Sequence, residues 1–188
     1  QNGSISYKDA EQYALKSGWI TSDALKESLN SNIPGENGFD KDSVKIVIDA
    51  LKQNYQYVSS AAETVQQNLN ESNGIGLKAI VLEFDEHGAS LLEKKLISYD
   101  DYDKAKWLLD DPLVQQSQNI VDRSEQKNAE FQSSSGLEVL VSRKYDDVGV
   151  HTTDKGGGDV CQWCLERCGT DIPYQEAYDM GMFERHPG

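Results

Sequence analysis

The sequence predicts a predominantly helical α+β protein, with a helical body over residues 1–135 and a small β and Cys/His module over residues 136–188. Three observations predict this class. Apolar residues recur at helical spacing for about 30 residues after Asp40. Apolar residues of strand type alternate with other residues after Gly136, and all three cysteines lie beyond that alternation.

The composition argues against some classes of binding partner and favours one type of cellular compartment. The net charge of -14 argues against nucleic-acid binding, because phosphate contacts need clustered Lys and Arg. Apolar runs are too short to span a bilayer, so we expect no membrane insertion. Three cysteines cannot all pair internally, which favours a reducing compartment. The chain begins with Gln1 rather than Met, and we expect a fragment or a processed product.

Two helices are expected before the long one. Ser6 and Asp9 have the spacing of a capping box, and Gly18 predicts the end of a short helix that begins there. A second helix is expected from Thr21 or Ser22. It should stop before a loop rich in Asn, Pro and Gly.

The long helix is the strongest structural signal. Its apolar residues recur in alternating steps of four and three, which places them in one stripe. The stripe consists of Val44, Ile48, Leu51, Tyr55, Val58, Ala62, Val65 and Leu69. Such a helix needs a partner. The alternatives are the chain's own helices or a coiled coil between subunits, which would form a homo-oligomer through the long helix 40–70.

The segment that follows is less regular. Residues 77–84 fit either a strand or an extended connector, and His87 is expected in a solvated turn. Ser98 or Asp100 is expected to cap a short helix. Pro112 suits the first turn of a further helix that ends shortly before Gly136.

The last part of the chain predicts a small β structure and one short helix. Residues 137–145 have the alternation of a strand, and residues 147–152 are its expected hairpin partner. A two-turn helix is expected between Pro173 and Gly181.

Cys161 and Cys164 form a CxxC, the spacing that brings two thiolates to one metal ion. His186 is the expected third zinc ligand, and Cys168, one helical turn after Cys164, is a substitute for a fourth. Two alternatives to structural zinc stay open from the spacing: thiols that only pack, and a redox or reactive CxxC. A Cys–His nucleophile or a metal-dependent nuclease has less support, since the acidic chain offers no basic groove.

Several motifs together resemble a known family. The run "IVDRSEQKNAEFQSSSGLEVLVSRKY", followed by "VCQWCLERCGT" and "MFERHPG", resembles the C-terminal part of minor head proteins of tailed bacteriophages and prophages of Gram-positive bacteria. These proteins read as a helix ending in an Asn-Ala pair and a Gly, a strand with an Arg, and then Cys-x-Trp-Cys, Gly-Thr and Arg-His. The matching residues are Asn128, Ala129, Gly136, Arg143, Cys161, Trp163, Cys164, Gly169, Thr170, Arg185 and His186.

The resemblance implies a structural protein of the virion rather than an enzyme. Its expected role is in head assembly, or in association with the portal or the capsid interior, with the portal protein and the major capsid protein as partners. Its expected location is the phage head, and the host cytoplasm during assembly. The family usually continues past the Arg-His pair with a Cys-x-Cys, so the resemblance implies a zinc site completed after Gly188. The alternative is an effector enzyme carried in the head, either a metal-dependent nuclease or a thiol enzyme that uses the Cys/His module.

Overall fold

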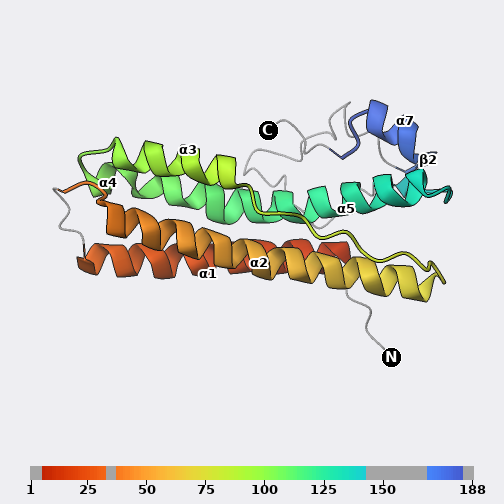
Figure 1. Ribbon diagram of the computed structural model, residues 1–188, viewed down its shortest axis with the longest axis horizontal. Helices are drawn as coiled ribbons and strands as arrows, with labels where there is room; N and C mark the ends of the chain where they lie inside the picture. The colour runs from red at the N-terminus through yellow and green to blue at the C-terminus, as the bar shows by residue number, and fades with distance from the viewer. Residues whose placement is uncertain (1–5, 33–36, 143–168, 184–188) are drawn as a thin grey trace, which may run out of the picture. The chain divides into compact units, whose positions relative to one another are not determined.

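The computed structural model describes residues 6–32, 37–142 and 169–183. Most of them are helical, and a small two-stranded antiparallel sheet lies near the C-terminus, which confirms the predicted predominantly α, α+β class (Figure 1). The chain divides into two compact units, Gln1–Asn128 and Ala129–Gly188. None of the described helices is long and apolar enough to cross a membrane.

The first helix, α1, runs without interruption over Tyr7–Asn32. Its capping box is confirmed, because the Ser6 N–H donates to Asp9 Oδ2 at 2.8 Å and the Asp9 N–H donates to Ser6 Oγ at 3.2 Å. The predicted end at Gly18 and the second start at Thr21 or Ser22 are wrong.

Gly18 is buried where α1 meets a later turn of the chain. A Cβ there would overlap the carbonyl oxygen of Leu113 and lie 2.9 Å from Val114 Cα. The glycine therefore permits a close approach of two backbones in mid-helix, and it does not end the helix.

The long helix, α2, spans Lys41–Ser72, as the apolar stripe predicts. Asp40 is its N-cap and accepts from the Ser43 N–H at 2.8 Å. Figure 1 shows α2 antiparallel to α1. Most stripe residues are buried against elements of the same chain, and Ile48, Leu51 and Leu69 are half-buried. The stripe thus has a partner within the chain, while a homo-oligomer through the long helix 40–70 stays a prediction.

The core of the first unit consists of two apolar clusters. The first joins the last turns of α1, the first turns of α2 and the segment 96–113 later in the chain, and its buried members are Leu25, Leu29, Phe39, Val44, Val47, Leu96, Tyr102, Ala105, Leu108, Leu109 and Leu113. The second lies farther along the helices and contains Ala10, Ala14, Tyr55, Val58, Val65, Ile120 and Val121.

Residues 77–84 form an extended connector and not a strand, which decides between the two alternatives. Side chains of α2 hold one edge of its backbone. Asn70 Nδ2 donates to Leu77 O at 2.9 Å, the Ala79 N–H donates to Gln67 Oε1 at 3.1 Å, and Tyr55 Oη donates to Glu83 O at 2.5 Å. Partly buried backbone groups that lack a neighbouring strand are satisfied here by side chains.

The helix α3, Glu86–Ile97, was not predicted from the sequence. Asp85 caps it by accepting from the Gly88 N–H at 2.9 Å. The prediction of a turn at His87 is wrong, because His87 lies in the first turn of α3, although it is exposed as expected.

A continuous helical stretch then passes through three local geometries. It begins as α4, Tyr102–Ala105, which is capped by Asp101 and not by Ser98 or Asp100. It continues as the 3₁₀ segment η1, Lys106–Leu109, and as the π-helical segment η2, Asp111–Gln115. The last part is α5, Gln116–Ser134, after which Gly136 has a φ of 85°.

The second unit contains a small sheet and a short helix. The strands β1, Leu140–Ser142, and β2, Asp171–Pro173, pair antiparallel, with Leu140 opposite Pro173 and Ser142 opposite Asp171. The predicted strand 137–145 is thus present in part. Its partner in the described part of the chain is β2, and residues 147–152 lie outside the described residues. Helix α7, Tyr174–Asp179, follows Pro173 as predicted.

Candidate functional site

The predicted metal ligands Cys161, Cys164, Cys168 and His186 all lie outside the described residues. The zinc site therefore stays a prediction. Within residues 6–32, 37–142 and 169–183, no group of three or more His, Cys, Asp or Glu side chains is suited to hold a metal ion.

The described residues nearest to the cysteines in sequence belong to the sheet. The chain leaves β1 after Ser142 and enters β2 at Asp171, and these two residues are direct partners in the sheet. Gly169, just before β2, has a φ of 86°, a backbone conformation that glycine adopts without strain. The sheet therefore joins the two ends of the segment that carries the three cysteines.

A small apolar core supports this sheet. Tyr174, Ala177 and Met182 are buried, and the ring of Phe183 lies 5.7 Å from that of Tyr174. The Tyr174 N–H donates to Val139 O at 2.9 Å, which ties the start of α7 to the residue before β1. These contacts give the base of the predicted Cys/His module a fixed structure of its own.

In the helical body, the described residues form a half-open cleft with a volume of about 260 Å³. Its walls come from α2, the end of the connector, α3, and the helical stretch from η1 to α5. The apolar lining consists of Leu51, Tyr55, Phe84, Ala89, Leu92, Leu108, Pro112 and Ile120, with Gly88 at the start of α3. The polar lining consists of Asn54, Asp85, Lys95, Gln116, Asn119 and Arg123.

The π-helical segment η2 shapes one wall of this cleft. Pro112 has no N–H to donate to the preceding turn, so the regular α-helical hydrogen-bond ladder cannot continue through it. In the same segment, the carbonyl of Leu113 accepts from Ser117 Oγ and lies 3.4 Å from Asn54 Nδ2. A π-helical turn of this kind often occurs at functional sites.

Asn54 connects three elements at the base of the cleft. It is almost fully buried, and its Oδ1 accepts from Ser17 Oγ of α1 at 3.0 Å. Its Nδ2 donates to Ser117 Oγ of α5 at 2.5 Å. Because these partners are specific, the amide fixes the register of α1, α2 and α5 beside the cleft.

The rim of the cleft carries three charged side chains. Lys95 of α3 and Arg123 of α5 are both exposed, and the Lys95 Nζ lies 5.8 Å from the centroid of the Trp107 ring. Within the described residues, neither cation pairs with a carboxylate. Asp85 is the one carboxylate in the lining, and it already accepts from Gly88 as the cap of α3.

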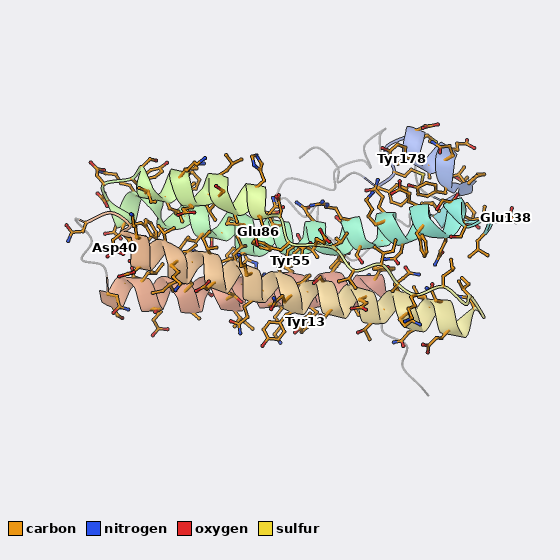
Figure 2. The ribbon with its side chains drawn as sticks, in the orientation of Figure 1. Tyr13, Asp40, Tyr55, Glu86, Glu138 and Tyr178 are labelled. Carbon is orange, nitrogen blue, oxygen red and sulfur yellow. The ribbon has the colours of Figure 1, made fainter. Side chains whose placement is uncertain are left out.

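Tyr55, which Figure 2 labels, lines the cleft and also contacts the connector. Its ring packs edge-on against Phe84 at 5.2 Å, and its hydroxyl donates to the Glu83 carbonyl. Burial raises the pKa of the Tyr55 hydroxyl above its usual range, and the positive charge of Arg123 opposes this rise. The hydroxyl therefore remains a hydrogen-bond donor at neutral pH, and it does not act as a base.

None of the cleft residues was predicted as a site residue, although Leu51, Tyr55 and Pro112 were assigned to helices. A signal for α3 was present, because Ala89, Leu92 and Leu96 have helical spacing and Asp85 precedes them as a cap. No sequence pattern indicated that α3 lies beside α2 and α5, because the three elements that form the walls are distant in sequence.

Comparison with known proteins finds no matching family, no matching curated protein and no matching solved structure.

Proposed function

We propose that the chain is a structural protein of a phage head, acting in head assembly or in association with the portal or the capsid interior. The observation that carries the proposal is the succession of motifs from the Asn128-Ala129 pair to the Arg185-His186 pair, which resembles minor head proteins. The virion is its proposed location, with the host cytoplasm during assembly.

One feature of the described fold supports the proposal. The resemblance implies a helix that ends before a glycine and is followed by a strand, and α5, Gly136 and β1 have this order. The resemblance places the Asn-Ala pair at the end of the helix, whereas Asn128 and Ala129 lie inside α5. Asn128 also has a physical role, because its amide binds the backbone of the connector.

The proposed partners are the portal protein and the major capsid protein. Contacts with them need surface that the fold leaves exposed. Large apolar side chains outside the stripe are exposed on both long helices, namely Tyr13, Trp19 and Ile20 on α1 and Ile46 and Tyr57 on α2 (Figure 2 labels Tyr13). Isolated apolar residues are common on protein surfaces, so these five define where to mutate and do not define an interface.

The Cys/His module is proposed to be stabilised by zinc, with Cys161, Cys164 and His186 as ligands. Zinc binding couples to folding in small modules of this kind. The sheet that joins Ser142 to Asp171 would supply a preformed base for such a module.

The test is incorporation into particles. Purified virions and assembling heads of the parent phage should contain the protein at a low copy number, and affinity purification of the portal or capsid protein should retain it. Replacing Tyr13 and Ile20 together by Ser should reduce this retention, whereas the exposed polar control Gln53→Ala should not. Absence of the protein from both virions and assembling heads would contradict the proposal. Nuclease or thiol activity that is lost in Cys161→Ala or His186→Ala would favour the effector alternative.

A further inference from the structure

The cleft of the helical body follows one face of α3 and one face of the helical stretch that leads into α5. Its lining residues at the start of α3 and along it are Asp85, Gly88, Ala89, Leu92 and Lys95. Those of the facing wall are Pro112, Gln116, Asn119, Ile120 and Arg123. Both sets have the spacing of residues on one side of a helix. About ten helical residues span about 15 Å, so the cleft is elongated.

The charged lining residues lie at the two ends of the cleft. The charges of Arg123 and Asp85 both act on the Tyr55 hydroxyl, which places them where α3 begins. Lys95 lies over the Trp107 ring, about ten helical residues farther along. A ligand group in the middle of the cleft therefore contacts no counter-charge among the described lining residues. Burying an unpaired ion costs far more than burying a neutral polar group, so the cleft favours an uncharged ligand.

Two carboxamide side chains lie along the middle of the α5 wall. Gln116 and Asn119 are at positions i and i+3, so their side chains are neighbours on the helix surface. Among the residues that the structure describes, neither has a hydrogen-bond partner, whereas Asn54 at the base of the cleft already binds Ser17 and Ser117. Each carboxamide offers donors and an acceptor. The pair therefore suits a ligand group that both donates and accepts, such as another carboxamide.

The floor between the two ends of the cleft is apolar. It consists of Leu51, Tyr55, Leu92, Leu108 and Ile120. Contact with this floor removes hydrocarbon from water, which favours binding. The volume of about 260 Å³ is just below the roughly 300 to 1,000 Å³ typical of sites for drug-sized ligands, so the ligand must be small.

We propose that the cleft binds a short, uncharged aliphatic amide, with its hydrocarbon chain along the apolar floor and its carboxamide group at Gln116 and Asn119. This inference does not depend on the proposed head function, because it concerns only residues of the helical body. Either proposal can fail while the other holds.

The test is a titration of the full ¹⁵N-labelled chain with hexanamide, followed by its backbone amide resonances. Three control ligands are compared: sodium hexanoate and hexylammonium chloride, which have a similar chain and opposite charges, and acetamide, which keeps the end group without the chain. Hexanamide should produce saturable shifts at Ala89, Leu92 and Gln116. It should bind at least about tenfold more tightly than either ion and than acetamide. Absence of saturable shifts, or equally tight binding of any control ligand, would overturn the proposal.

Variants locate the site. Gln116→Leu and Asn119→Leu should each weaken hexanamide binding about fivefold, the effect of one lost hydrogen bond. The matched control is Gln115→Leu, which makes the same change at an exposed residue outside the lining. Leu92→Trp should fill the cleft and abolish the shifts, whereas Leu91→Trp, at the exposed neighbouring position, should not. Equal weakening by Gln115→Leu and Gln116→Leu, or unchanged binding to the Leu92→Trp variant, would refute the assignment.

Discussion

The side-chain amide of Asn128 forms hydrogen bonds with both the backbone N–H and the backbone carbonyl of Ile80. The Ile80 N–H donates to Asn128 Oδ1 at 2.7 Å, and Asn128 Nδ2 donates to Ile80 O at 3.2 Å. A neighbouring β-strand would pair with the same two groups. One side-chain amide from α5 thus replaces a strand, and the connector lies between α2 and α5 with side-chain hydrogen bonds to both helices.

Replacing Asn128 by Ala should lower the free energy of unfolding by about 2 to 3 kcal/mol, because it leaves polar backbone groups of the connector without partners. Urea denaturation measures this loss. Hydrogen exchange at the Ile80 amide should also accelerate. Gln53→Ala, at an exposed position of α2, is the control and should change stability by no more than about 0.5 kcal/mol. Similar effects of the two substitutions would disprove the role of Asn128.

Gly18→Ala should destabilise the chain by about 2 to 3 kcal/mol, although alanine is the better helix former by about 1 kcal/mol. The reason is the overlap of the new Cβ with the backbone at Leu113. Thermal unfolding measures the loss. Gly76→Ala is the matched control, because no heavy atom lies within 4 Å of a Cβ built there. A neutral or stabilising Gly18→Ala would show that the two backbones do not approach closely.

Asp110 should make stability depend on pH. Burial favours the neutral carboxyl, but hydrogen bonds from Lys26 and Ser22 and the charge of Lys26 hold the pKa of Asp110 below its usual value. A carboxylate whose pKa is depressed by folding stabilises the folded chain above the unfolded pKa of about 3.9, and this contribution is lost as pH falls through the folded pKa.

Asp110→Asn should therefore lower the free energy of unfolding at pH 7 by about 0.5 to 1 kcal/mol, a modest value because the Asp110 side chain is 34% exposed. The difference between the variant and the natural chain should shrink at pH 3. Urea denaturation at both pH values measures it, with the exposed Asp49→Asn as control. A difference that stays constant between the two pH values would rule out this linkage.

The predicted zinc site can be tested by elemental analysis. A chain extended past Gly188 with the residues of its parent gene should contain about one zinc per molecule. Cys161→Ser should abolish the metal and destabilise the C-terminal module more than the helices. Cys168→Ser should retain it, since Cys168 is only a substitute ligand. An extended chain free of zinc would remove this part of the proposal.

Elements defined by local patterns were predicted well. The apolar stripe located α2, and Asp40 and Ser6 identified two helix starts, because the spacing of side chains on a helix and the geometry of a cap depend on neighbouring residues alone. The helix after Pro173 followed from the same kind of signal.

The predictions failed where contacts between segments distant in sequence determine the local structure. Gly18 resembled a helix end because the requirement for its missing Cβ comes from Leu113. The connector could not be told from a strand, because its partners are side chains of α2 and α5 and not a second backbone. The cleft was missed for the same reason, as its walls come from α2, α3 and α5, which are distant in sequence.

The hydrogen bonds of the connector imply an order of folding events. The bond from Asn70 to Leu77 spans 7 residues and the one from Ala79 to Gln67 spans 12, whereas Asn128 is 48 residues from Ile80. Closing a short loop costs less chain entropy, so the connector can fold back on α2 before α5 arrives. Protection of the Ile80 amide should therefore appear later in refolding than protection of Ala79. The two edges of the connector would then become ordered at two separate stages in the assembly of the helical body.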